Sequence, residues 1–385
     1  MKFNHTVRGK IADYGTMVFS EVSRLFNEYR ALDLSRGFPN FAHDQKLAKL
    51  IKKHIDEDRN YYLSINGHKG LRRNIASIFS ERYGATYDPS NEITITAGAS
   101  QAIYTVLSSI VRENDEVIIF EPSYDQFAPT VEINRGKPIY VNMEEDDFHI
   151  DWSKVQKLIT PNTRMIILNN PHNPTGTILK AHDFDELHRI VNGTDIMVLG
   201  DESLQFLVYD GYEHHSLARK QELAERSFIV GGFGKTFQIT GWRVGFCIAP
   251  EDLMHEFRKL HQYIAFNVNT PAQFALDEYL SDGVDFNQIS QSFSQKRDYF
   301  ASLLTETAFE PLPVKAGIFQ PVKFPNEESL SDKDMALKLI RDYGVAGVPL
   351  SAYTHDHVNF GILRFCFARP DEVLDQAAEK LKHIK

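Results

Sequence analysis

The sequence predicts an α/β fold: a large domain with a mostly parallel sheet sandwiched by helices, and a smaller α+β domain. Short apolar runs bounded by turn residues recur between stretches of helical periodicity, as is typical of strands buried on both faces of a parallel sheet. The 385 residues suffice for two domains. We expect an N-terminal arm with part of the small domain over 1–45, a large ligand-binding domain over 46–285 and a small C-terminal domain over 286–385.

The predicted elements follow in chain order. A β-branched run at 93–96 predicts a strand, and an amphipathic helix follows, with apolar residues at the 3.6-residue period: Ile103, Val106, Leu107, Ile110 and Val111. Further strands are predicted at the apolar runs 117–120, 165–168, 196–199, 228–230 and 244–248. A helix from about 287 to 307 would lead to the small domain, with strands near 318–319 and 362–365 and a last helix from about Pro370.

Composition narrows the function. A formal net charge of −10 argues against a nucleic-acid partner or an anionic membrane surface. Cys247 and Cys366 lie in apolar runs, so we expect buried thiols, compatible with a reducing compartment. Residues 1–5 lack the apolar core of a signal peptide, and no run approaches membrane-spanning length. These features favour a cytoplasmic enzyme with small-molecule substrates, without a metal.

Lys235 is the most informative residue. It lies in a glycine-rich turn after the predicted strand at 228–230. A lysine held in a partly dry place loses its proton more readily and can form a Schiff base with an aldehyde. Arg243, eight residues later, suits a phosphate. A lysine taken alone is more often a solvated surface residue, and it is the rest of the chain that favours a functional role for Lys235.

Other polar residues follow predicted strands, where open α/β sheets bind ligands. The small-residue turn at 98–101 opens the amphipathic helix and could cradle a phosphate or form an ordinary helix cap. Tyr124 offers an aromatic ring, and Asn173 lies in a turn between prolines. Asp201 ends a strand, where a carboxylate is costly to bury unless paired, although it could also cap the next helix.

In their order and spacing, these motifs resemble the class I and II aminotransferases of fold type I, which depend on pyridoxal 5'-phosphate (PLP). The resemblance covers nearly the whole chain and rests on these motifs: Gly37-Phe38-Pro39, Gly98-Ala99-Ser100, Tyr124, Asn173-Pro174-Thr175-Gly176, Asp201-Glu202, Lys235-Thr236-Phe237, Thr240-Gly241-Trp242-Arg243 and Arg364. The stretches at 268–273 and 363–368 are most similar to bacterial methionine aminotransferases, relatives of the kynurenine and glutamine transaminases.

The resemblance implies how the large domain would hold PLP. Lys235 would bind the cofactor aldehyde as a Schiff base and later move a proton. Asp201 would pair with the pyridine nitrogen and keep it protonated, while Asn173 would donate to the ring oxygen. The remaining contacts implied are the ring of Tyr124 stacked on the cofactor, the backbone N–H groups of Ala99, Ser100 and Gln101 on the phosphate, and the charge of Arg243 beside them.

The resemblance also implies substrate contacts and a partner. Arg364 would bind the substrate carboxylate through a bidentate fork, helped by the backbone of Gly37 and by Asn173. Tyr62 would reach the phosphate from the neighbouring subunit, so the site would need a homodimer with shared active sites.

Two positions depart from the family pattern. The family usually has a tyrosine where this chain has Leu204, and that phenol donates to the cofactor's ring oxygen. It also usually has a serine where this chain has Gly232, so one phosphate contact would be missing. Whether Ser203 or Gln205 substitutes is open.

The resemblance implies an aminotransferase of amino-acid metabolism that exchanges an amino group between an L-amino acid and a 2-oxo acid. The segment at 266–269 is neutral, so methionine and aromatic substrates are favoured. Two alternatives stay open: a PLP-dependent carbon–sulfur β-lyase, and a PLP-binding protein with weak catalysis. The preferred donor, acceptor and pathway are not given by the sequence.

Overall fold

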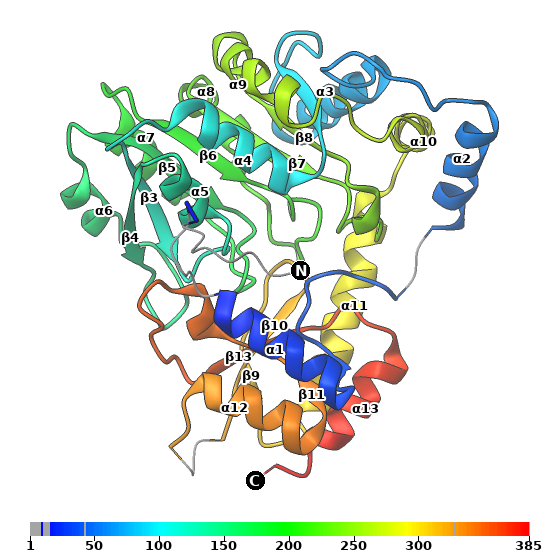
Figure 1. Ribbon diagram of the computed structural model, residues 1–385, viewed down its shortest axis with the longest axis vertical. Coiled ribbons are helices and arrows are strands. Elements are labelled where there is room, and N and C mark those ends of the chain that lie inside the picture. The colour runs from blue at the N-terminus through cyan, green and yellow to red at the C-terminus, as the bar shows by residue number, and fades with distance from the viewer. Residues whose placement is uncertain (1–8, 11–15, 42–43, 326–328, 385) are drawn as a thin grey trace, which may run out of the picture.

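A computed structural model of the chain describes residues 9–10, 16–41, 44–325 and 329–384. It contains a large lobe built on a seven-stranded sheet and a small lobe built on a four-stranded sheet (Figure 1). Residues 1–5, from which we expect no signal peptide, lie outside the described residues. Among the described helices, none combines the length and apolar character needed to cross a membrane.

The large sheet is mostly parallel, as predicted. Its strands, in spatial order, are β2 (Ile93–Thr96), β8 (Gly245–Ile248), β7 (Ser227–Gly232), β6 (Met197–Asp201), β5 (Thr163–Asn169), β3 (Glu116–Glu121) and β4 (Lys137–Asn142). Only β8 runs against its neighbours β2 and β7, and every other pair is parallel.

Side chains alternate between the two faces of this sheet, so the central strands carry apolar residues on both faces. In β3, Ile118 and Phe120 belong to the core on one face, whereas Val117 and Ile119 belong to the core on the other. The first core includes residues of α3 (Lys69–Tyr83), α6 (Trp152–Leu158), α7 (Ala181–Val191) and α8 (Gln221–Ala224), and the second includes residues of α4 (Ala99–Ile110), α5 (Phe127–Ile133) and α9 (Glu251–Ile264). Beside these layers, α2 (Gln45–Asp56) packs on α10 (Thr270–Ser281).

The small lobe has its own core. Its antiparallel sheet has the order β12 (Val348–Pro349), β13 (Ile362–Cys366), β10 (Phe319–Lys323) and β9 (Glu310–Pro311). The helices of this region are α1 (Thr16–Tyr29), α11 (Phe286–Leu304), α12 (Asp332–Lys338) and α13 (Asp371–Leu381), joined by short helical turns at η3 (Leu339–Tyr343) and η4 (Leu350–Tyr353). Two further turns, η1 (Leu217–Arg219) and η2 (Thr240–Trp242), belong to the large lobe.

The N-terminal segment belongs partly to the small lobe. β1 (Leu32–Asp33) pairs in parallel with β11 (Val345–Ala346), and Figure 1 shows α1 lying across the small lobe beside α12. The expected domain plan, with boundaries at 45 and 285, stays a prediction. The two cysteines are buried free thiols in β8 and β13.

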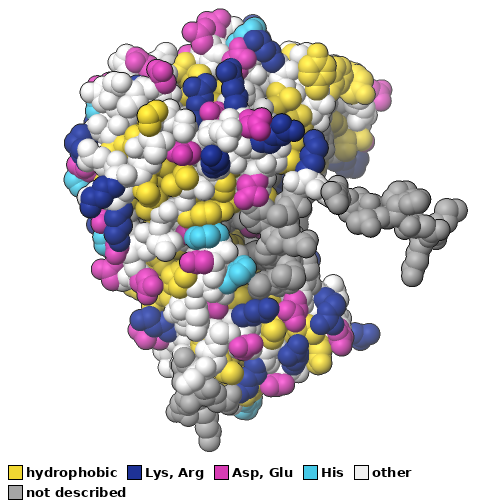
Figure 2. Space-filling model, turned by 60° about the vertical axis from the view of Figure 1, so that its left-hand side comes forward, with side chains coloured by type: hydrophobic (Ala, Val, Ile, Leu, Met, Phe, Trp, Pro, Cys, Tyr) yellow, Lys and Arg dark blue, Asp and Glu magenta, His cyan; other side chains and the backbone are white. Residues whose placement is uncertain are grey.

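The surface carries charges of both signs. Figure 2 shows Lys and Arg side chains interspersed with Asp and Glu side chains over one face of the molecule.

Candidate active site

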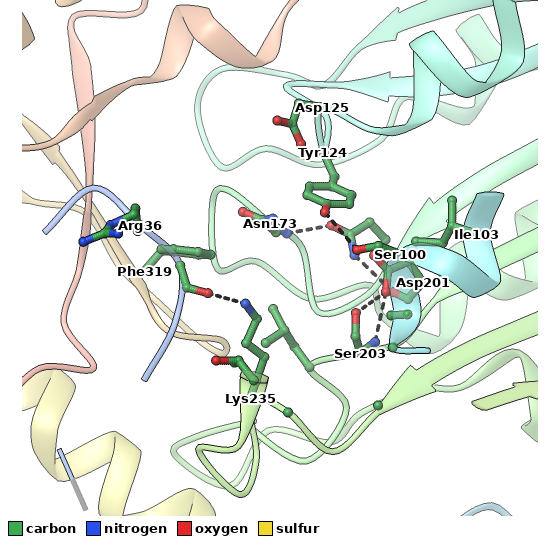
Figure 3. Close-up of a pocket in the computed structure, with 18 of the residues that line it drawn as sticks. Arg36, Ser100, Ile103, Tyr124, Asp125, Asn173, Asp201, Ser203, Lys235 and Phe319 are labelled. Carbon is green, nitrogen blue, oxygen red and sulfur yellow. Dashed lines mark hydrogen bonds between the residues drawn. The ribbon is translucent and has the colours of Figure 1, made fainter. Parts of the chain in front are cut away.

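A cavity of about 380 Å³ lies where the carboxyl ends of the parallel strands meet the small lobe. The large lobe contributes the residues that follow β3, β5, β6 and β7, and the small lobe contributes Phe319, Tyr353 and Arg364. The predicted site residues that line it are Gly37, Ala99, Ser100, Tyr124, Asn173, Asp201, Lys235, Arg243 and Arg364. Segments far apart in the sequence therefore meet in one place (Figure 3).

Lys235 projects into this cavity from the turn after β7 (Figure 3). Just before the turn, within β7, a Cβ at Gly231 would lie 2.2 Å from the Phe246 ring, so the strand can pack closely only with glycine there. The Lys235 Nζ donates to the carbonyl of Gly37, which anchors the amine across the cavity. Burial lowers the pKa of Lys235 to about 8. The amine is therefore a nucleophile near neutral pH.

Asp201 ends β6 and is 5 % exposed. Its Oδ1 accepts from the backbone N–H of Ser203 at 3.1 Å and from the Ser203 hydroxyl. Burial raises the pKa of Asp201 above its usual value, against the lowering effect of the Ser203 hydrogen bonds and of the Lys235 charge. Ser203 thus holds one carboxylate oxygen in place, and Asp201 still lines the cavity. A cationic ring nitrogen is the kind of partner that would stabilise this carboxylate.

Asn173 and Arg364 are held together. The backbone N–H of Asn173 donates to Asn169 Oδ1 at 2.8 Å, which fixes the turn, and Asn173 Oδ1 accepts from Arg364 Nη1 at 3.2 Å. Because the oxygen of Asn173 faces Arg364, its Nδ2 remains as a donor for a ligand.

Arg364 lies in the middle of β13 and is 4 % exposed. Its Nη2 donates to the carbonyl of Ser35 at 2.7 Å, and its guanidinium lies 3.8 Å from the ring centroid of Phe319 and 5.0 Å from that of Tyr353. Its Nε is buried and has no hydrogen-bond partner among the described residues. A buried guanidinium without a carboxylate partner fits a site for an anionic group.

The N-terminus of α4 forms the other end of the cavity. Gly98, the N-cap, has φ +81°, a conformation that favours glycine, and no side chain caps the helix. A Cβ at Gly98 would lie 2.6 Å from Arg243 Nη2, so glycine lets the guanidinium approach the turn. Uncapped N–H groups beside an arginine suit a phosphate.

Tyr124 is fixed beside this helix end. Its hydroxyl lies 3.3 Å from Ser100 Oγ, and Gln126 Nε2 donates to the Ser100 carbonyl at 2.6 Å. Burial raises the pKa of the Tyr124 phenol, which keeps it protonated. The structure thus brings the predicted ring and the predicted cradle together.

Two predicted residues lie outside the cavity wall. Gln101 accepts from the backbone N–H of Ala97 at 2.9 Å through Oε1, and its Nε2 donates to Thr105 Oγ1 at 2.6 Å, so its side chain supports the turn from behind. Tyr62 is 76 % exposed and packs edge-on against Phe266, with ring centroids 5.2 Å apart. Within this chain, it is a surface residue.

Ser203 and Gln205 do not replace the two hydroxyl groups that the family pattern has where this chain has Leu204 and Gly232. The Ser203 hydroxyl is engaged with Asp201, and Gln205 is fully buried and accepts from the Tyr83 hydroxyl at 3.1 Å. Leu204 and Gly232 both line the cavity. The phenol and serine hydroxyls of the family pattern therefore have no substitute from these two residues.

Sequence reasoning missed several lining residues, among them Arg36, Asp125 and Tyr353. Arg36 and Asp125 are charged, and Tyr353 packs beside Arg364. Arg36 adjoins the Gly37-Phe38-Pro39 motif and Asp125 follows Tyr124, so their proximity to named motifs was the available signal. Nothing in the sequence showed that their side chains face the same cavity as Lys235.

Comparison with known proteins gives consistent matches. The family model described as aminotransferase class I and II matches residues 30–381. Methionine aminotransferase of Escherichia coli K12 is 35 % identical over 98 % of both chains, and kynurenine–oxoglutarate transaminase of Dictyostelium discoideum is 30 % identical over 97 % of this chain and 95 % of that one. A solved Escherichia coli structure, of a protein with an identified methionine aminotransferase function, superposes with a TM-score of 0.94 at 34 % identity, covering 99 % of this chain and 100 % of that one.

Proposed function

Because the chain belongs to the class I and II aminotransferases, we propose that it moves the amino group of methionine or an aromatic L-amino acid to a 2-oxo acid with PLP as cofactor. One observation carries the proposal: an amine with a lowered pKa, a carboxylate, an amide and an unpaired guanidinium line one cavity, contributed by Lys235, Asp201, Asn173 and Arg364. These groups match the needs of an aldehyde, a ring nitrogen, a ring oxygen and a substrate carboxylate.

The residues present fit the cofactor. When bound, PLP supplies an aldehyde for the amine and a ring that withdraws electrons from the substrate. The N–H groups of Ala99, Ser100 and Gln101, with Arg243, would hold the phosphate, and the ring of Tyr124 would limit the tilt of the cofactor. Asp201 would keep the ring nitrogen protonated, and Asn173 Nδ2 would donate to the ring oxygen.

Lys235 would do two tasks. Its amine would bind the cofactor aldehyde at rest and carry a proton at Nζ between two positions once substrate is present. A pKa of about 8 lets the same nitrogen accept and release a proton near neutral pH. Arg364 would fix the substrate carboxylate and orient its α C–H bond toward Lys235.

The proposal includes a homodimer with shared active sites, in the cytoplasm. Tyr62 and Phe266 form an exposed aromatic pair, and Tyr263, nearby in the sequence, is 83 % exposed. A cluster of exposed aromatic side chains is typical of a protein–protein interface. In a C2 dimer, Tyr62 would contribute to the partner's phosphate site. A fully active monomer in size-exclusion chromatography would contradict this part.

A half-reaction screen tests the proposed function. Purified PLP-loaded protein is mixed with single L-amino acids, and the cofactor absorbance is followed without any acceptor. We expect methionine and aromatic amino acids to convert the cofactor fully and to yield their 2-oxo acids. Pyruvate release from cystathionine with little transamination would indicate a β-lyase instead, and no spectral change with any amino acid would indicate a binding protein.

A further inference from the structure

Six charged side chains line the cavity: Arg36, Asp125, Asp201, Lys235, Arg243 and Arg364. Under the proposed function, four of them have a chemical task toward cofactor or α-carboxylate. Arg36 and Asp125 have no such task. These two residues therefore set the charge of the surroundings that a substrate side chain would enter.

Arg36 is already neutralised. Its Nε donates to Asp33 Oδ2 at 2.6 Å, and its guanidinium lies 5.0 Å from the ring centroid of Phe26. Asp33 is held in turn by the Ser35 hydroxyl at 2.8 Å, and its pKa is lowered despite partial burial, so it stays ionised. A second substrate carboxylate would have to compete with Asp33 for this arginine.

Of the two carboxylates that line the cavity, Asp201 is hydrogen-bonded by Ser203, whereas Asp125 has no such side-chain partner in the described part of the chain. Asp125 lines the wall of the cavity and is exposed to solvent, which places it at the mouth. Figure 3 shows it beside Tyr124. Among the described residues, none makes an ion pair with its carboxylate or donates a side-chain hydrogen bond to it. Asp125 and Arg364 line the same cavity. Burial raises the pKa of Asp125, and the positive charge of Arg364 opposes this rise.

We propose that Asp125 determines substrate specificity by repelling a second carboxylate, so that the site takes amino acids and 2-oxo acids with uncharged side chains. This inference rests on the proposed function. The α-carboxylate has Arg364 as its partner, but a side-chain carboxylate finds an anion at the mouth and an arginine already paired with Asp33. Exclusion by an unfavourable charge is a general way to build specificity.

The test compares Asp125→Asn with the wild-type enzyme. The amide has the shape of the carboxylate without its charge, and kcat/KM is measured for methionine, glutamate and aspartate. We expect the glutamate-to-methionine ratio of kcat/KM to rise about tenfold at low salt, with methionine kcat retained, and less at high salt because ions screen the mouth. Glu132→Gln, in α5 and outside the cavity wall, changes the net charge equally and should leave the ratio unchanged.

Two results would overturn the inference. An unchanged ratio in Asp125→Asn would show that this charge does not select substrates. A parallel rise in KM for all three amino acids would show that Asp125 instead positions Arg364. Both leave the proposed function intact, whereas a wild-type protein that reacts with no neutral amino acid would refute that function and the inference together.

Discussion

At the scale of residues, Gly232 is the position where an added hydroxyl group should change the affinity for PLP. A Cβ built there meets its nearest atoms at 3.7 Å, an ordinary contact, so the serine of the family pattern fits without strain. We expect Gly232→Ser to add a hydroxyl contact to the phosphate and to strengthen PLP binding about fivefold, since a net hydrogen bond contributes roughly 1 kcal/mol. Fluorescence titration of the apoprotein with PLP measures this.

The adjacent glycine provides the control. At Gly231, a Cβ would lie 2.2 Å from the Phe246 ring, so Gly231→Ser should destabilise the fold by about 1–3 kcal/mol in urea unfolding. If Gly232→Ser folds normally and binds PLP no better than wild type, Gly232 does not face the phosphate.

Lys235 should titrate far below an ordinary lysine. Burial disfavours its ammonium form, so the pKa of about 8 predicts that the free amine is lost as pH falls through 8 and prevails above it. Acetylation of Lys235 in the apoprotein, followed by peptide mass spectrometry across pH, should show a midpoint near 8. N-acetyl-lysine amide, with a pKa of about 10.4, is the reference, and a matching midpoint for Lys235 would contradict the account.

At the scale of elements, β3 and the loop after η4 are joined by a clasp between the buried carboxylate of Glu121 and the partly exposed ring of His355. Glu121, which ends β3, accepts from the His355 backbone N–H at 2.8 Å and interacts with His355 Nδ1 at 2.7 Å, while the His355 ring stacks on Tyr140 with centroids 4.0 Å apart. Ser123 N–H also donates to the Tyr353 carbonyl at 2.8 Å. The clasp therefore ties Tyr353, which packs beside Arg364, to the segment that carries Tyr124.

A double-mutant cycle tests this clasp. Glu121→Gln should lower stability by about 1–3 kcal/mol, because a buried hydrogen-bonded carboxylate loses its partner geometry, and should raise KM for methionine more than it lowers kcat. Combined with His355→Ala, the two effects should fall short of additivity by about 1 kcal/mol. Simple additivity would show that the pair is not coupled.

Local patterns predicted the elements that are buried on both faces. β3, β5, β6 and β7 appear as continuous apolar runs because helices cover both sides of the sheet. The edge strand β4 has one fully buried residue, Val141, and gives no such run. The pairing of β1 with β11 joins residues more than 300 positions apart, which no local pattern encodes.

The site shows the same distinction between residues that a local sequence pattern locates and residues that only the folded structure brings together. Lys235, Asp201 and Asn173 follow predicted strands, so the rule for open sheets located them. Gln101 matched the cradle by position, yet its side chain turns toward His261, 3.2 Å away and 160 residues later. Asp125 and Arg36 adjoin predicted motifs in the sequence, but no local pattern showed that their side chains face the cavity.

At the scale of the whole molecule, the two lobes contribute different groups to the site. The large lobe carries the amine of Lys235, the carboxylate of Asp201 and the proposed phosphate cradle, and the small lobe carries Arg364, the proposed carboxylate clamp. Reaction geometry therefore depends on how the lobes meet, which is where Gly37 accepts the hydrogen bond of Lys235. The central claim is that this lysine is the group that carries the chemistry.

Reductive trapping tests that claim most directly. PLP-loaded protein is treated with borohydride, digested and mapped by mass spectrometry, in parallel with Lys235→Ala and with the surface variant Lys220→Ala. We predict one phosphopyridoxyl group, on Lys235, in wild type and Lys220→Ala. In Lys235→Ala we predict residual PLP binding, no trapped adduct and a loss of turnover on the order of 10³-fold or more. A normal yield of adduct on another lysine, or in Lys235→Ala, would contradict the account.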